Sequence, residues 1–382
     1  MRIFLMWDGP SQEFDFPMPT MELLDVLDQM HSAPGNTAVD FEIVDCDSAY
    51  APLDVLYGQV FRADIFKLNL FAHRYEMMEK PDRIIYQALL SRFEPTDFEQ
   101  VLRLTYGLEQ VPCICAKDVA ELGRFSIENA MLPEIERCPE EMLPLLGRTE
   151  VGKAMLARNG GVLIDGYYCE PEHYEMPDIR IEIQKPEDVF FRLLIGRMER
   201  DDRDAQWLSL PCTEEQIHEI EVSQGLVIGS MYCYRLDSCI PEIGRASLSG
   251  MRDFHLLNDL AKQLAGLEPL ERRKLKAVME LEELSTLQDA LDAVGRLPAY
   301  QFDPAVNDNS DYAQEFLTRN LPEQFDADML AGVEMQELGA NLLRRMKGQV
   351  TAYGAIARCD DLYALPVMEP ELDETPQMGG MA

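Results

Sequence analysis

The sequence is poor in basic residues, and it has no long apolar run. Its 382 residues include 34 Lys and Arg against 69 Asp and Glu, which gives a formal net charge of -35 at pH 7. A charge of this size repels nucleic acid and anionic membranes and attracts basic surfaces. No apolar stretch approaches the roughly 18 residues of a membrane-spanning helix. The sequence therefore predicts no direct binding to nucleic acid or membrane, and it indicates a basic protein as the partner.

Histidine is scarce, and the cysteines follow no pattern. The five histidines form no His-Glu-x-x-His motif, and none pairs with a glycine-flanked serine or cysteine. The nine cysteines are an odd number without regular spacing, in a chain far longer than the small secreted domains that depend on disulfides. The apolar run at residues 2–7 ends at Asp8 and is too short for a signal peptide. We therefore expect a soluble, cytoplasmic protein with reduced thiols.

Two short motifs suggest enzymatic chemistry, and both fail on their context. Gly147–Lys153 matches the start of a phosphate-binding P-loop, but Ala154 follows where magnesium coordination needs a Ser or Thr hydroxyl. We expect a helix face there instead. Cys113-Ile114-Cys115 has no second pair at metal-ligand spacing, which predicts a buried strand with alternating thiols. We therefore expect no catalytic residue, cofactor or metal, while the many carboxylates leave a paired-carboxylate enzyme or a calcium site as an alternative.

A helical block at residues 69–104 occurs a second time at about residues 258–293. A shift of 189 positions, the difference between Asn258 and Asn69, aligns the two without a gap. Possible capping boxes at Thr96–Glu99 and Ser285–Gln288 predict that one helix begins at the same place in both copies. The sequence therefore indicates a tandem duplication. The identical pairs are Asn69 and Asn258, Ala72 and Ala261, Glu79 and Glu268, Arg83 and Arg272, Ala88 and Ala277, Glu94 and Glu283, and Leu102 and Leu291.

Each copy predicts an α+β module: a small sheet with a helix, a helical middle, and a C-terminal α+β part. Thr20 and Thr213 are expected to open the first helix of each copy, and Asp118-Val119-Ala120 is aligned with Asp311-Tyr312-Ala313. The predicted modules are residues 1–170 and 187–358, joined by a linker at 171–186 and followed by an acidic, disordered tail at 359–382. The expected strands are residues 2–7, 14–17, 41–47, 161–168, 190–195, 207–211 and 349–357.

The excess charge has the magnitude of a stretch of DNA. B-DNA carries about one charge per 1.7 Å of axis, so about 35 charges correspond to roughly 60 Å of duplex, or about 17–18 base pairs. The acids are spread over both copies, so an acidic tail alone does not account for them. A rigid acidic surface of this length could enter a DNA-binding cleft and gain from counterion release as DNA does.

The chain resembles two tandem copies of the ArdA family of antirestriction proteins. The resemblance covers most of the chain through short motifs in a shared order. The second copy carries the clearer match in Trp207–Pro211, Leu256–Ala261, Leu284–Ala293, Asp311–Ala313 and Gly348–Ala357. The first copy follows with Phe16-Pro17, Leu68–Ala72 and Asp118–Ala120.

This resemblance implies elongated three-part modules with acids along one curved face. Mobile genetic elements use proteins of this family to inhibit type I restriction-modification enzymes by imitating DNA, and two modules pair to complete the DNA-like shape. Because this chain carries both modules, we expect a monomeric pseudo-dimer rather than a homodimer.

The leading hypothesis is a non-enzymatic DNA mimic that blocks the DNA-binding cleft of a type I restriction-modification enzyme. An acidic inhibitor or adaptor of another basic DNA-binding protein, such as a nucleoid factor or a CRISPR effector, is the first alternative. An enzyme built on paired carboxylates is the second. In the leading hypothesis, exposed acids of both copies form the partner-binding surface: Glu22, Asp25, Asp28, Asp45, Asp47, Asp97, Glu99, Glu214, Glu215, Glu219, Glu282, Glu283, Asp289 and Asp292.

Overall fold

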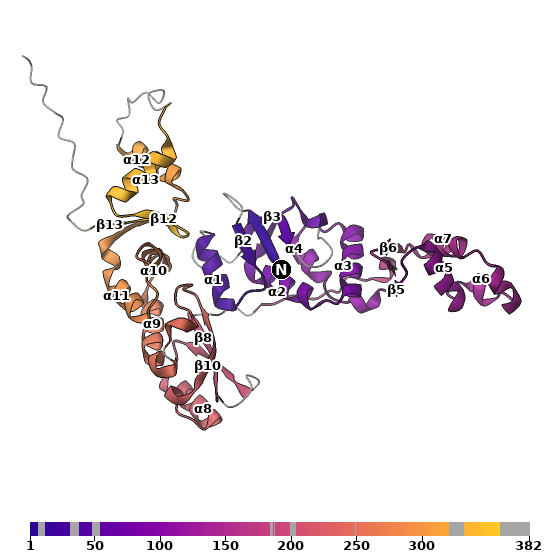
Figure 1. Ribbon diagram of the computed structural model, residues 1–382, viewed down its shortest axis with the longest axis horizontal. Coiled ribbons are helices and arrows are strands. Elements are labelled where there is room, and N and C mark those ends of the chain that lie inside the picture. The colour runs from indigo at the N-terminus through magenta and orange to yellow at the C-terminus, as the bar shows by residue number, and fades with distance from the viewer. Residues whose placement is uncertain are drawn as a thin grey trace, which may run out of the picture. The chain divides into compact units, whose positions relative to one another are not determined.

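The computed structural model divides the chain into two compact units (Figure 1). The first consists of Met1–Leu23 and Gly35–Glu187, and the second of Leu24–Pro34 and Asp188–Ala382. The division falls within helix α1 (Thr20–Gln29), so its residues from Leu24 onward count with the second unit. The structure describes residues 1–6, 12–30, 38–47, 54–183, 186, 188–198, 204–248, 250–320 and 332–359. Apart from Cys359, the predicted tail lies outside these residues.

The first unit begins with an antiparallel sheet in the order β2-β1-β3-β4. Side chains alternate between its faces, as the period of a strand requires. Ile3 and Leu5 of β1 and Phe41 and Ile43 of β3 are buried, while Arg2 is exposed. The strands are β1 (Arg2–Met6), β2 (Gln12–Asp15), β3 (Ala38–Asp47) and β4 (Val60–Asp64).

An aromatic core joins this sheet to the helical middle. Phe98 contacts the rings of Phe41, Phe61 and Phe71 edge-on, at centroid distances of 5.5, 5.9 and 5.8 Å. Asp97 begins helix α4, because its carboxylate accepts the backbone N–H of the third helical residue at 2.8 Å. The helices are α2 (Ile65–Met77), α3 (Lys80–Phe93) and α4 (Phe98–Arg103).

A small sheet and a close pair of helices complete the first unit. The sheet has the order β5-β7-β6 and packs against α3. Helices α5 and α7 approach so closely that a Cβ at Gly152 would lie 1.9 Å from the Val119 carbonyl oxygen, which no real Cβ tolerates. Only glycine fits this contact. The elements are β5 (Cys113–Cys115), α5 (Val119–Glu128), α6 (Pro133–Glu136), α7 (Arg148–Asn159), β6 (Val162–Ile164) and β7 (Tyr167–Cys169).

The second unit repeats much of this order of elements, although its described residues include no counterpart of β4 or α6. Its first sheet, β10-β8-β9, corresponds to β3-β1-β2, and its last sheet, β11-β13-β12, corresponds to β5-β7-β6. A Cβ at Gly339 would lie 1.8 Å from the Asn309 carbonyl oxygen, which repeats the contact at Gly152. The elements are β8 (Phe191–Gly196), β9 (Gln206–Leu210), α8 (Glu214–Gln224), β10 (Tyr232–Ser238), α9 (Phe254–Gly266), α10 (Pro269–Leu281), α11 (Leu287–Arg296), β11 (Tyr300–Asp303), α12 (Asn309–Asn320), α13 (Met335–Arg345), β12 (Gln349–Thr351) and β13 (Gly354–Arg358).

A matching asparagine ties the first sheet to the helical middle in both units. The side-chain oxygen of Asn69 accepts the N–H of Met18 at 2.8 Å, and its amide group donates to the carbonyl of the same residue at 3.0 Å. Asn258 holds Cys212 in the same way, at 2.9 and 3.2 Å. One amide side chain thus satisfies both backbone polar groups of one residue, which is half-buried in the first unit and buried in the second. These parallels support the tandem duplication, which stays a prediction together with the module boundaries.

The α+β fold class is confirmed, and three local predictions need correction. The helix predicted to begin at a cap on Thr96 instead begins at Asp97, and its counterpart begins at Thr286 rather than Ser285. The closing runs at 161–168 and 349–357 are each a hairpin of two strands, because two-residue turns interrupt them: Asp165-Gly166, both left-handed, in the first and Ala352-Tyr353 in the second.

The third correction concerns the alignment of α5 with α12. Asp118 caps α5 by accepting the Glu121 N–H at 2.8 Å, and Asp308 accepts the Asp311 N–H at the same distance. The structure therefore matches Asp118 with Asp308, one helical turn before the predicted Asp311.

The two chemical motifs have structural explanations. The P-loop-like stretch forms the start of α7, with Gly147 as the residue before the helix, so the expected helix is confirmed. The predicted strand at Cys113–Cys115 is confirmed, but its thiols are not all buried: Cys113 is half-buried and Cys115 is exposed. The reason is that β5 lies at the edge of its sheet. Among the described residues, no helix has the length and apolarity to cross a membrane.

The contact at Gly152 yields a stability prediction. Gly152→Ala should lower the free energy of unfolding of the first unit by about 1–3 kcal/mol, because α5 and α7 must separate to admit the methyl group. Gly295→Ala in α11 is the matched control, since nothing lies within 4 Å of its Cβ position. Alanine there should stabilise by up to about 1 kcal/mol through helix propensity. Urea denaturation followed by circular dichroism measures both, and equal effects would contradict the assigned contact.

Candidate partner-binding surface

Helix α8 carries a dense group of exposed acids. Thr213 begins the helix: its hydroxyl accepts the N–H of Gln216 at 3.4 Å, and the Gln216 side chain accepts the N–H of Thr213 at 2.9 Å. Glu214, Glu215 and Glu219 are exposed, and none makes an ion pair with a described residue. The first two lie in the first turn, where the helix dipole stabilises negative charge. Their charge is therefore available to a partner.

The charge density of α8 is close to that of one DNA strand. The helix has 11 residues, four of them acidic when Glu221 is included. At about 1.5 Å per residue it is about 16 Å long, so it carries about one carboxylate per 4 Å. One DNA strand carries about one phosphate per 3.4 Å of axis.

Five further predicted acids are exposed. Gln100 and Gln288 donate hydrogen bonds to Asp97 and Asp292, at 2.7 and 2.9 Å. These neutral partners orient the two carboxylates without cancelling their charge. The exposed set consists of Glu22, Asp45, Asp97, Glu283 and Asp292. The side chain of Asp47 lies outside the described residues.

The prediction that Asp25 is an exposed contact residue is wrong. Asp25 is only 4% exposed and accepts hydrogen bonds from Lys276 Nζ at 2.8 Å and from the Tyr353 hydroxyl at 2.9 Å, all within the second unit. Lys276 also binds Asp28 at 2.6 Å, which leaves Asp28 only partly exposed. Burial opposes the charge on Lys276, but Asp28 and Asp25 raise its pKa above the ordinary value. Asp25 is therefore not available to a partner, and Asp28 is only partly available.

Three other predicted acids are partly exposed and bound within the protein. Glu99 forms ion pairs with Lys67 and Arg103, and Glu282 pairs with Arg296 at 3.0 Å. The Thr286 hydroxyl donates to the carboxylate of Asp289. Local cations therefore reduce the charge that Glu99 and Glu282 present, and neither acts as a free phosphate analogue. The remaining predicted surface is smaller than expected.

The sequence prediction missed a group of acids in the first unit. Glu136, Glu140 and Glu141 are exposed and make no ion pair with the rest of the described chain. Glu136 is the last residue of α6, and Glu140 and Glu141 follow on a segment that Pro139 interrupts, so no long helix forms there. The sequence pattern that could have predicted their exposure is the cluster of acids around prolines in this stretch, because such a segment stays at the surface.

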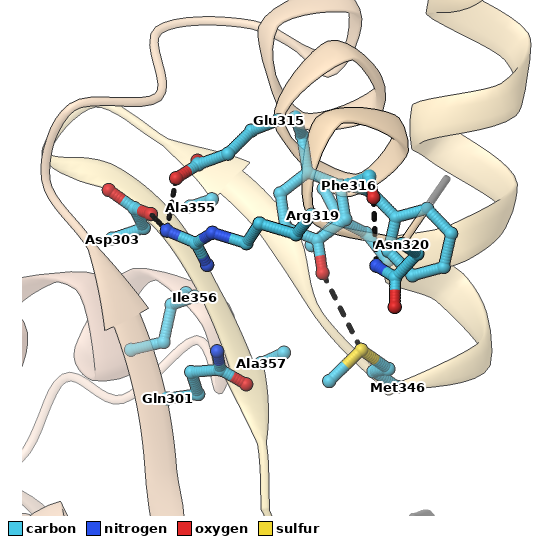
Figure 2. A pocket seen from close by; sticks show the side chains of 12 residues that line it. Gln301, Asp303, Glu315, Phe316, Arg319, Asn320, Met346, Ala355, Ile356 and Ala357 are labelled. Atoms are coloured by element: carbon cyan, nitrogen blue, oxygen red, sulfur yellow. Dashed lines mark hydrogen bonds and ion pairs between the residues drawn. The ribbon is translucent and has the colours of Figure 1, made fainter. Parts of the chain in front are cut away.

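A cavity of about 190 Å³ lies between α12, α13 and β13, and it contains two neighbouring acids (Figure 2). Arg319 lies between Asp303 and Glu315 and forms ion pairs with both, at 3.6 Å to Asp303. Burial raises the pKa of Glu315, and the hydrogen bond and charge of Asp303 raise it further. A paired-carboxylate enzyme requires a concave site that holds acids with raised pKa, and this cavity holds one acid of that kind.

The chemistry of this cavity is limited. Phe316, Leu343, Met346 and Ile356 form its apolar side, and its described lining contains no histidine, cysteine or serine. The single positive charge of Arg319 offsets one of the two carboxylates. The described residues contain no group of three or more side chains suited to hold a metal ion. In comparisons with known proteins, no family model matches this chain and no curated protein matches it.

The buried lysine yields a second stability prediction. Lys276→Ala should lower the free energy of unfolding of the second unit by about 3–5 kcal/mol, because it leaves Asp25 buried without a cation. Lys262→Ala is the control: Lys262 pairs with Asp259 at 3.4 Å on an exposed face, and its loss should cost less than about 1 kcal/mol. Trp207 fluorescence in a Trp7→Phe background reports unfolding of this unit alone. Similar losses of unfolding free energy in both variants would contradict a buried ion pair between Lys276 and Asp25.

Glu242 yields a pH prediction. Burial raises its pKa, and the charge of Asp25 adds to the increase. A carboxyl with a raised folded-state pKa is protonated more readily in the fold, so its ionisation destabilises the fold at neutral pH. Glu242→Gln should stabilise the second unit at pH 7 by no more than about 1 kcal/mol, because the side chain is only half-buried.

The advantage of Glu242→Gln should shrink as pH falls through the raised pKa towards the ordinary glutamate range. Trp207 fluorescence during urea titration at pH 7 and pH 5 measures the change. An advantage that grows at pH 5 would contradict the direction of the shift.

Proposed function

We propose that this chain is an antirestriction protein, an acidic DNA mimic that binds the DNA-binding cleft of a type I restriction-modification enzyme in the cytoplasm. The observation that carries the proposal is the set of exposed, unpaired acids on α8, in a chain with a net charge of -35. The resemblance to the ArdA family selects the target class. We also propose that the protein is a monomer with two modules, and that it has neither enzymatic activity nor a cofactor.

The mechanism rests on electrostatic competition. A DNA-binding cleft is lined by Lys and Arg. Binding of a polyanion there is favourable because the ions held by the cleft and by the polyanion are released into solution. A capped helix holds its carboxylates at a fixed spacing before binding. Binding therefore avoids the loss of conformational entropy that ordering a flexible segment would cost. The mimic occupies the cleft but offers neither a base to methylate nor a phosphodiester to cleave.

Displacement of labelled duplex from a type I methyltransferase tests the proposal. The protein should release the duplex at near-stoichiometric concentration at low salt. Its own affinity for the methyltransferase, measured directly, should fall as salt rises, with a slope of up to about 0.9 per charge contact if the carboxylates behave as DNA phosphates do. Absence of displacement would contradict the proposed target, and a direct affinity that does not change with salt would contradict electrostatic mimicry.

A matched pair of triple variants tests the role of α8. Changing Glu214, Glu215 and Glu219 together to Gln should reduce the salt slope by about 3 and raise the half-displacement concentration about tenfold or more. The control changes Glu128, Glu134 and Glu150 to Gln, which alters the net charge equally but removes acids that already pair with Arg124, Arg158 and Lys153. Equal weakening in both variants would show that total charge, rather than α8, governs binding.

An inhibitor or adaptor of another basic DNA-binding protein is the alternative. It shares the acidic surface of α8 and differs only in its target. Pull-down of nucleoid factors and CRISPR effectors alongside the methyltransferase separates the two proposals, since only the true target should be displaced from DNA by stoichiometric protein.

A further inference from the structure

Cys113 and Cys169 lie opposite each other in the last sheet of the first unit. Strands β5 and β7 are antiparallel, and their register pairs these two residues directly. The next pair along, Pro112 and Glu170, is a hydrogen-bonded one, because the Glu170 N–H donates to the Pro112 carbonyl at 3.1 Å. Hydrogen-bonded and non-hydrogen-bonded pairs alternate in an antiparallel ladder. The two cysteines therefore occupy a non-hydrogen-bonded position.

This position suits a disulfide. Residues in a non-hydrogen-bonded pair have Cα atoms about 4.5 Å apart. Disulfides join residues whose Cα atoms are about 4.4–6.8 Å apart. The sulfur atoms of Cys113 and Cys169 are 3.4 Å apart, within contact distance of each other. A small rotation of the two side chains brings them to bonding distance without moving the strands.

The two thiols differ in a way that assigns their roles. Cys169 is buried and donates a hydrogen bond to the sulfur of Cys113, which is half-buried. This hydrogen bond lowers the pKa of Cys113, against the opposing effects of burial and the charge of Asp82. The same bond, together with burial, raises the pKa of Cys169. Cys113 is thus the nucleophilic thiolate, and Cys169 is the thiol that resolves the product.

We propose that Cys113 and Cys169 form a reversible disulfide when the protein meets a peroxide. The Cys113 thiolate attacks one peroxide oxygen, which forms an S–O bond, breaks the O–O bond and releases hydroxide. The Cys169 sulfur then attacks the sulfenic acid, forming the S–S bond and releasing the second oxygen as hydroxide, which takes up the thiol proton as water. Overall, two thiols lose two electrons and two protons, and hydrogen peroxide becomes two waters. A small thiol reductant reverses the step by exchange.

The disulfide would close the chain around α5, α6 and α7, since the two cysteines are 56 positions apart. A cross-link over a long segment restricts its unfolded ensemble and so opposes local opening. The corresponding strands of the second unit, β11 and β13, pair Phe302 with Ile356. Oxidation therefore acts on the end of the first unit and leaves the second unchanged. The inference does not depend on the proposed function.

Peptide mapping of the full chain tests the disulfide. The protein is treated with a small excess of hydrogen peroxide, its remaining thiols are alkylated after denaturation, and a tryptic digest is analysed by mass spectrometry. Trypsin leaves Cys113 and Cys115 in one peptide, because no Lys or Arg lies between them. The Cys115→Ser variant therefore assigns the link, and it should yield a Cys113–Cys169 peptide that reductant removes.

Cys113→Ser is the matched variant on the same strand, and it should yield no link to Cys169. Hydrogen exchange provides a second measurement: oxidation should slow exchange in residues 113–169 by about tenfold or more, and Cys113→Ser should show no such change. Oxidation of Cys113 to a sulfinic acid while Cys169 stays alkylatable would overturn the proposal. So would a link between Cys169 and any other cysteine.

Discussion

Repulsion among carboxylates is the constraint under which this chain folds. Basic residues are half as numerous as acids, and several of them are committed to the interior. Lys276 pairs with both Asp25 and Asp28, while Arg83 and Arg273 donate to backbone carbonyls, at 3.2 Å to Tyr75 and 3.3 Å to Tyr353. Each arginine that binds a backbone carbonyl is one cation fewer for the acids. The acidic surface is therefore partly a consequence of how the cores are stabilised.

The sequence predicted the features that depend on local pattern. Repetition at a shift of 189 positions located the helical block, and alternation of apolar residues located the strand at 41–47, because burial of one face of a strand selects that pattern. The helix starts were shifted by one residue at Asp97 and Thr286, since neighbouring residues can equally supply a capping oxygen. The prediction of single closing strands overlooked Asp165-Gly166, a typical hairpin dipeptide whose two residues are left-handed. The second hairpin turns at Ala352-Tyr353, which carries no such signal.

The candidate site was less predictable, because exposure is a tertiary property. Helical spacing placed Asp25 on the polar face of α1, but a lysine 251 positions later buries it. Nothing near Asp25 in the sequence announces that contact. Glu214, Glu215 and Glu219 behaved as predicted because their helix packs through a narrow apolar stripe around Ile217. Acids on the outer side of such a helix remain exposed wherever the rest of the chain lies.

The glycine at position 152 shows how one residue can satisfy two different patterns. In the sequence it completes the spacing of a phosphate loop, whereas in the structure it is the point at which one helix touches the backbone of another. Gly339 makes the same backbone contact, although the residue that follows it in the sequence is alanine and not lysine. A motif search that ignored interhelical distance would assign a nucleotide to the first position and nothing to the second. The same steric requirement, a close contact between two helix backbones, accounts for the glycine at both positions.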